Sequence, residues 1–141
     1  MTACLIAERV LEESDKTLTA IRLVDRITAE VPGDMIGVSP LVIPFSGAFL
    51  LMLKHRGATA GKHDVAVRIK RPSGEVTQVS HASVAIQAGE GRGANLVTRF
   101  TVGLTERGIY WFEAVVDDKL VVATPLEVVM QPGSPAGARP A

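Results

Sequence analysis

Alternation of apolar and polar side chains along residues 18–31 constrains the fold of this chain more than any other feature. One face of the segment is apolar, whereas the other carries mostly charged or polar residues. The apolar positions are Ile21, Leu23, Ile27, Ala29 and Val31, and the opposite positions are Arg22, Val24, Arg26, Thr28 and Glu30. Because successive side chains of a β-strand point to opposite sides, this period of two predicts one long strand with a buried face.

Seven further segments between turn-forming residues are predicted as strands. They cover residues 3–12, 48–55, 63–71, 76–86, 95–102, 108–116 and 119–130. The segment 48–55 is nearly continuously apolar, so a helical turn is the alternative there. Turns are expected at residues 72–75 and at Asp117 and Asp118. Strands of this length and spacing predict an all-β, immunoglobulin-like antiparallel β-sandwich of about seven to eight strands.

The length of 141 residues suits a single domain. We predict one β-sandwich domain over residues 1–130. Residues 131–141 hold three prolines and two glycines without any apolar period, and this composition predicts a disordered tail.

Charge and cysteine content restrict the expected partners and compartment. Basic and acidic residues number 15 each, so the formal net charge is zero. Nucleic acids and anionic membranes are bound by surplus positive charge, and we expect neither as a partner. No apolar run reaches the roughly 18 residues of a membrane span, and Glu8 interrupts the run that a secretion signal would need. With Cys4 alone no intrachain disulfide can form, so we expect a cytoplasmic protein.

A tyrosine near the start of a late strand is typical of the corner that pins immunoglobulin-like sandwiches. There the tyrosine hydroxyl bonds to the backbone upstream, and Tyr110 has this position. If Tyr110 and Phe112 face the core, Trp111 faces outward together with Ile109 and Val115. Because tryptophan is enriched in binding hot spots, we predict an interface at these three residues. The alternative is that Trp111 lies under a loop or the tail.

Four short motifs give the chain a resemblance to a known family. They are AERVL at residues 7–11, LTAIRLVDRI at 18–27, GIYWF at 108–112 and PLEVV at 125–129. In these motifs the chain resembles a family of small bacterial proteins known only as a domain of unknown function. The resemblance covers roughly residues 3–130. It implies a β-sandwich and brings no activity, cofactor or catalytic residue with it.

Two acidic residues interrupt apolar rows. Asp25 falls in the apolar row of residues 18–31, and Glu8 shares a face with Ile6 and Val10. An inward carboxylate must be paired or hydrogen-bonded, so we predict that arginines hold Asp25 and Glu8 at a sheet rim or that these acids guard an edge. The alternative is a perturbed acid in a cleft.

No motif for catalysis or metal binding is complete. The histidines are His55, His63 and His81. They lack the spacing of a metal site, which needs three or four converging ligands. The glycine-rich residues 89–93 lack the lysine and helix of a phosphate loop, and Ser46 and Ser73 stand in no nucleophile motif. We therefore expect neither an enzyme nor a bound cofactor or metal.

The expected function is a non-enzymatic protein-interaction or structural module. Its partner would be another protein or a second copy of the chain. The alternative is a small-molecule or metal-binding β-sandwich whose site lies in the loops 32–44, 57–62 or 87–94.

Overall fold

The computed structural model describes residues 2–32, 42–54, 61–86 and 93–133, and these residues form nine β-strands and no helix. The strands are β1 (Thr2–Glu12), β2 (Leu18–Leu23), β3 (Arg26–Pro32), β4 (Ile43–Lys54), β5 (Gly61–Lys70), β6 (Val76–Ile86), β7 (Gly93–Leu104), β8 (Gly108–Val116) and β9 (Lys119–Gly133). The predicted all-β class is confirmed. No helix in the described part of the chain is long and apolar enough to cross a membrane.

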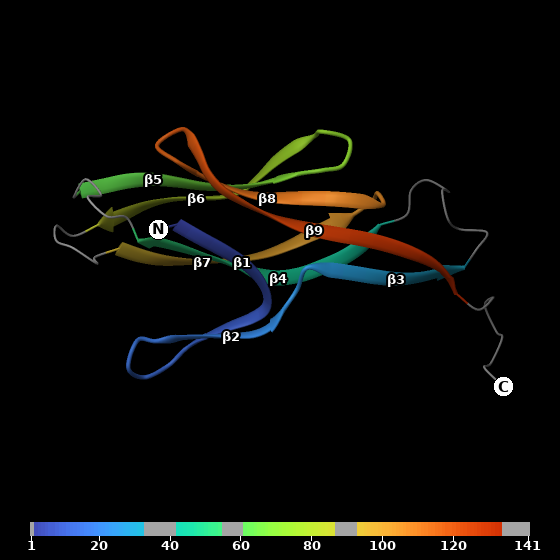
Figure 1. Ribbon diagram of the computed structural model, residues 1–141, viewed down its shortest axis with the longest axis horizontal. Helices are drawn as coiled ribbons and strands as arrows, with labels where there is room; N and C mark the ends of the chain where they lie inside the picture. Colours follow the sequence, from blue (N-terminus) through green and yellow to red (C-terminus); the bar gives the residue numbers. More distant parts are fainter. Residues whose placement is uncertain (1, 33–41, 55–60, 87–92, 134–141) are drawn as a thin grey trace.

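The strands form two sheets (Figure 1). One has four strands in the order β2-β1-β4-β7, and the other has five in the order β3-β9-β8-β5-β6. Neighbouring strands are antiparallel except β3 and β9, which run parallel with Ile27 opposite Val128. The predicted antiparallel pairing is therefore wrong at this edge, because β3 enters the second sheet without a reversal after β2.

The strand predicted over residues 18–31 is in fact two strands in different sheets. Between them, the backbone N–H of Val24 donates to the carbonyl of Ile6 in the first sheet at 2.9 Å. The carbonyl of the next residue, Asp25, accepts the N–H of Glu127 in the second sheet at 3.0 Å. The chain therefore changes sheet between two consecutive residues, and this raises the number of strands in the described residues to nine.

This change of sheet corrects the predicted faces of several side chains. Leu23, predicted on the buried face, is 68% exposed, whereas Val24 packs against the main core. Asp25 lies at the bend and is exposed, so its predicted inward orientation is wrong. Glu8 is also exposed, because β1 has turned away from β4 at this point, and its carboxylate accepts from Arg22 Nε at 3.1 Å.

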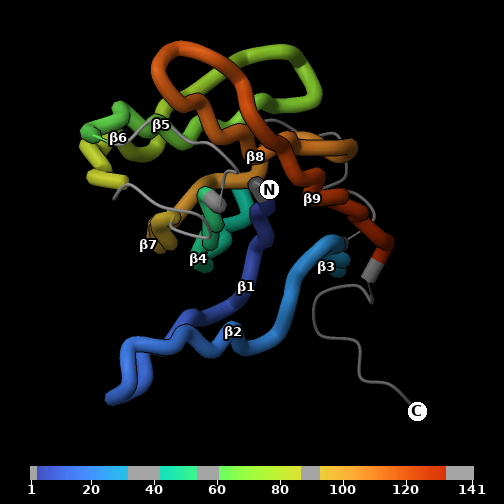
Figure 2. The backbone as a smooth tube through the Cα atoms, turned by 60° about the vertical axis from the view of Figure 1, so that its left-hand side comes forward, coloured from blue at the N-terminus to red at the C-terminus, as the bar shows by residue number. Residues whose placement is uncertain are grey.

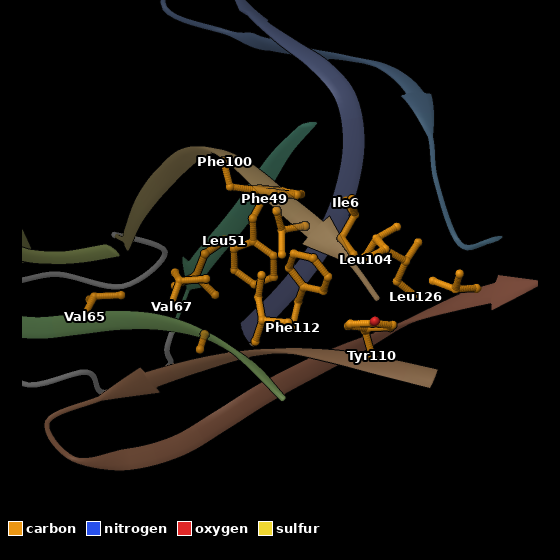
Figure 3. Close-up of a cluster of buried hydrophobic side chains, with 14 of the residues drawn as sticks. Ile6, Phe49, Leu51, Val65, Val67, Phe100, Leu104, Tyr110, Phe112 and Leu126 are labelled. Atoms are coloured by element: carbon orange, nitrogen blue, oxygen red, sulfur yellow. The ribbon is translucent and has the colours of Figure 1, made fainter. Parts of the chain in front are cut away.

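The main hydrophobic core lies between the two sheets, and both sheets contribute to it (Figure 3). Three aromatic rings stand in it: Phe112 of β8 lies 4.9 Å from Phe100 of β7 and 6.4 Å from Phe49 of β4, measured between ring centroids. The other buried members are Ile6, Leu51, Leu53, Val65, Val67, Ile69, Val102, Leu104, Tyr110, Ala114, Leu126 and Val128. Each large apolar side chain buried here contributes about 1.5–3 kcal/mol to folding.

A smaller apolar cluster covers the opposite face of the four-stranded sheet. Its buried members are Ala7, Val10, Ala48 and Leu50. β1 pairs with β4 along residues 2–7 and with β2 along residues 7–12. Past Ala7, β1 therefore leaves β4 and carries the β1–β2 hairpin away from the rest of the molecule (Figure 2).

The C-terminal hairpin follows the sequence expectation closely. Asp117 and Asp118 have φ angles of 49° and 64°, the left-handed backbone that a tight two-residue turn requires. β9 then continues to Gly133, where Pro132 lies opposite Val31 of β3. Residues 131–133 thus belong to a strand, and residues 134–141 of the predicted tail lie outside the described residues.

Candidate functional site

The outer face of β8 presents the residues predicted as an interface. Tyr110 and Phe112 are fully buried, whereas Trp111 is 40% exposed and Ile109 is 46% exposed. Val115 is partly buried. The predicted division of β8 into a core face and a Trp111 face is confirmed, and the interface itself stays a prediction.

Trp111 belongs to a row of exposed side chains that crosses four strands of the five-stranded sheet. The row consists of Val76 on β6, Lys70 on β5, Trp111 on β8 and Pro125 on β9, each paired with the next in register. All four residues are exposed. We call these four residues, with Ile109 and Val115, the Trp111 surface.

An ion pair lies beside this surface. Arg68 Nε of β5 donates to Glu113 Oε1 of β8 at 2.8 Å, and the side chain of Glu113 is only 10% exposed. A carboxylate this buried is costly unless it is paired and hydrogen-bonded. Because Arg68 satisfies it within the chain, Glu113 places no unpaired charge next to Trp111.

Exposed apolar side chains concentrate on this sheet. Eight large hydrophobic residues of the described chain are exposed, and five of them lie on β6, β8 or β9. These five are Val76, Ile109, Trp111, Leu120 and Val121. Surface apolar residues scattered singly need no explanation, but exposed apolar residues that are paired on neighbouring strands, as Trp111 and Pro125 are, are typical of contact surfaces.

His63 and Asp117 form a second polar pair at one end of the five-stranded sheet. His63 Nδ1 lies 2.6 Å from Asp117 Oδ2, and Asp117 Oδ1 accepts the backbone N–H of Asp64 at 3.0 Å. These hydrogen bonds, first that from His63, lower the pKa of the Asp117 carboxyl. The pair ties β5 to the β8–β9 turn. Among the described residues no three histidine, cysteine or acidic side chains converge as metal ligands.

The other residues considered from the sequence as metal, catalytic or ligand sites either have a structural role or lie outside the described residues. His81 is exposed on β6, and Ser73 Oγ accepts the backbone N–H of Glu75 at 3.4 Å within the predicted turn. His55 lies outside the described residues. So do residues 33–41, 55–60 and 87–92, which make up most of the loops considered for ligand binding.

Sequence reasoning missed a cleft of about 610 Å³ beside the β1–β2 hairpin. It is lined by Glu8, Arg9, Val10, Leu11, Ser46, Gly47, Ala48, Arg99, Phe100 and Thr101. Three strands contribute to it where β1 separates from β4. Gly47 is the signal in the sequence that could have indicated this region, since a glycine inside an apolar strand often marks a place where another segment of backbone comes close. A Cβ at Gly47 would lie 2.9 Å from the carbonyl oxygen of Ala7.

A family model covers most of the chain. The model of a family of unknown function, DUF6941, matches residues 2–129. No curated protein matches the sequence.

Several solved structures resemble the fold distantly. Two are crystal structures of beta-glucosidase from Listeria innocua, one in complex with glucose and one with isofagomine. They share 10% and 11% identity with the chain at TM-scores of 0.47 and 0.43, and each match covers 92% of this chain and 16% of the enzyme. A third is the Pseudomonas fluorescens alkylpurine DNA glycosylase AlkC bound to DNA containing an abasic site analog. Its identity is 13% and its TM-score 0.41, over 89% of this chain and 30% of AlkC.

Proposed function

The chain belongs to DUF6941, a family of unknown function. We propose that it acts as a non-enzymatic interaction module that associates with a second copy through the Trp111 surface. The observation that carries this proposal is the row of exposed residues from Val76 to Pro125, with Trp111 near its centre. Tryptophan supplies more binding energy than most residues when a partner covers it.

A second copy fits this surface because five of its six residues are uncharged and the neighbouring Glu113 is paired with Arg68. The whole chain has a formal net charge of zero, so two copies do not repel each other strongly. Within the Trp111 surface the charged member is Lys70 on β5, and Glu127 lies across from Ile109 on β9. A two-fold axis along β8 would set β5 of one copy over β9 of the other, so that each Lys70 would lie over Pro125 of the other copy, two residues along β9 from Glu127. Arg26 contacts the Glu127 carboxylate at 3.4 Å.

The first test measures association directly. Trp111 is the single tryptophan of the chain, so its fluorescence reports on this surface alone. With rising protein concentration we expect light scattering to show a dimer and the Trp111 emission to shift to shorter wavelength, since dimerisation removes water from the indole. A monomer at all concentrations, with unchanged emission, contradicts the proposal.

A pair of variants distinguishes specific association through this surface from non-specific hydrophobic association. Trp111→Ala should prevent dimerisation while leaving the chain folded, because the side chain lies on the outer face. Leu23→Ser is the matched control, since Leu23 is an exposed apolar residue of the β1–β2 hairpin, outside the Trp111 surface. Equal loss of dimer in both variants would rule out a specific role for the Trp111 surface.

The immunoglobulin-like fold and the cytoplasmic location are parts of the same proposal. The bonded corner at Tyr110 supports the first, with Phe112 at the position where antibody domains carry a cysteine. The free thiol of Cys4 supports the second, because reducing compartments keep thiols unpaired. A crystal structure in which the two sheets do not pack face to face would contradict the fold, and fluorescent tagging in cells tests the location.

A further inference from the structure

We propose that the cleft between the β1–β2 hairpin and strands β4 and β7 binds a small anion with a carboxylate or phosphate group next to an apolar group. The cleft is on the four-stranded sheet, so this proposal is independent of the Trp111 surface. Its volume of about 610 Å³ lies within the roughly 300–1,000 Å³ of small-molecule sites.

The shape of the cleft follows from the path of β1. Ala7 is the last residue of β1 opposite β4, where it faces Ala48. Past this point the β1–β2 hairpin continues on its own, and residues 8–11 form one wall of the cleft. β4 and β7 stay paired in register through the same region and form the floor, with Ser46 opposite Thr101 and Ala48 opposite Arg99.

The charge of the cleft favours an anion. Two arginines line it, Arg9 from β1 and Arg99 from β7. Neither forms an ion pair with a described carboxylate, and Arg99 Nη2 donates to the carbonyl of Val10 at a long 3.5 Å. The acid in the lining, Glu8, is paired with Arg22 at 3.1 Å, and the two arginines of the lining outnumber it. Guanidinium groups bind carboxylates and phosphates with strong, charge-assisted hydrogen bonds.

A hydroxyl pair adds a donor on the floor of the cleft. Ser46 Oγ and Thr101 Oγ1 lie 2.8 Å apart, so one hydroxyl donates to the other. The second hydroxyl of the pair keeps a hydrogen that it can donate to an oxygen of the ligand. The rest of the lining is apolar, including Leu11, which is 40% exposed. Because the lining combines arginines and hydroxyls with apolar residues, the ligand should combine an anionic group with an apolar one.

Residue-resolved titration of the full-length, ¹⁵N-labelled chain tests the proposal. The probes are phenyl phosphate, benzoate, inorganic phosphate and the neutral benzyl alcohol. We expect saturable shifts of the amides of residues 8–11, 46–48 and 99–101 with at least one aromatic anion. Inorganic phosphate should bind about tenfold more weakly and benzyl alcohol not measurably. Tighter binding of benzoate identifies a carboxylate ligand, and tighter binding of phenyl phosphate a phosphate ligand.

Charge-removing variants complete the test. Arg9→Gln and Arg99→Gln should each weaken binding of the tighter probe about tenfold, the effect of one lost charge-assisted bond. Arg107→Gln is the control, because Arg107 is an exposed arginine that does not line the cleft. The proposal fails if neither aromatic anion gives saturable shifts at these amides up to about 10 mM. It also fails if Arg9→Gln and Arg99→Gln bind like Arg107→Gln, or if inorganic phosphate binds as well as the aromatic anions.

Discussion

The hydroxyl of Tyr110 and the backbone of Glu106 are bonded to each other in both directions. The Tyr110 oxygen accepts the N–H of Glu106 at 3.0 Å and donates to the carbonyl of the same residue at 3.3 Å. It also accepts the N–H of Thr105 at 3.1 Å. One buried side chain thus bonds three backbone polar groups between β7 and β8. The predicted tyrosine corner is confirmed in its bonding.

Tyr110→Phe should lower the free energy of unfolding by about 1–3 kcal/mol, because two backbone donors lose a part-buried acceptor. Urea denaturation measures the change. The ring stays in the core, so the loss comes from the hydroxyl alone. Hydrogen exchange should accelerate at the amides of Thr105 and Glu106 more than at the core strands. Unchanged exchange at these two amides would show that the corner is held by packing only.

Gly47→Ala should destabilise the chain by about 1–3 kcal/mol. Its Cβ would meet the carbonyl oxygen of Ala7 at 2.9 Å and the rings of Phe45 and Phe100 at 3.3 Å, and a backbone atom cannot move aside cheaply. The matched control is Gly103→Ala, where the nearest atom is the end of the exposed Val42 side chain at 2.8 Å. Thermal unfolding of both variants should show a clearly larger loss for Gly47→Ala, and equal losses would argue against the close approach of β1 and β4.

Asp117→Asn should remove part of the acid sensitivity of the fold. Hydrogen bonds from His63 and from the Asp64 backbone lower the pKa of Asp117 in the folded state. A carboxyl with a lowered folded-state pKa adds stability above its unfolded pKa of about 3.9, and this stability is lost as pH falls through the lower folded value. The wild type should therefore exceed Asp117→Asn in stability at neutral pH, and the gap should close in acid.

Urea midpoints measured between about pH 7 and pH 2 test this dependence. Asp118→Asn is the control, because Asp118 has the same left-handed backbone and stands in the same turn. Asparagine also tolerates that backbone, so neither variant strains the turn. A pH-independent gap for Asp117→Asn would contradict the link to its ionisation.

Much of the fold could be predicted from periodicity and turn chemistry. Eight segments are expected as strands, and every one of them contains strand, including residues 48–54 of the apolar run, which lie in β4. Turn chemistry was equally reliable: Gly74 has a φ of 94° in the turn expected at residues 72–75. These features depend on neighbouring residues alone, and for this reason a sequence reveals them.

Features that depend on distant strands could not be predicted. The cleft forms because β1 exchanges β4 for β2 as its partner after Ala7, and no local pattern states which strand is the partner. Arg9 and Arg99 are 90 positions apart in the sequence and line one cleft only because of this arrangement. Period two at residues 18–31 likewise continues on both sides of a bend, so it could not show that the chain changes sheet there.

Substitutions at that bend test whether residues 18–31 form one long strand or two short ones. An uninterrupted strand would bury Leu23 and expose Val24, whereas the structure leaves Leu23 68% exposed and packs Val24 against the main core. Leu23→Ser should therefore change the free energy of unfolding by less than about 0.5 kcal/mol. Val24→Ser should cost about 1–3 kcal/mol, because it loses apolar contacts and places a hydroxyl against the core. Urea denaturation of the two variants side by side measures both values, and the reverse order would mean that residues 18–31 form a single strand.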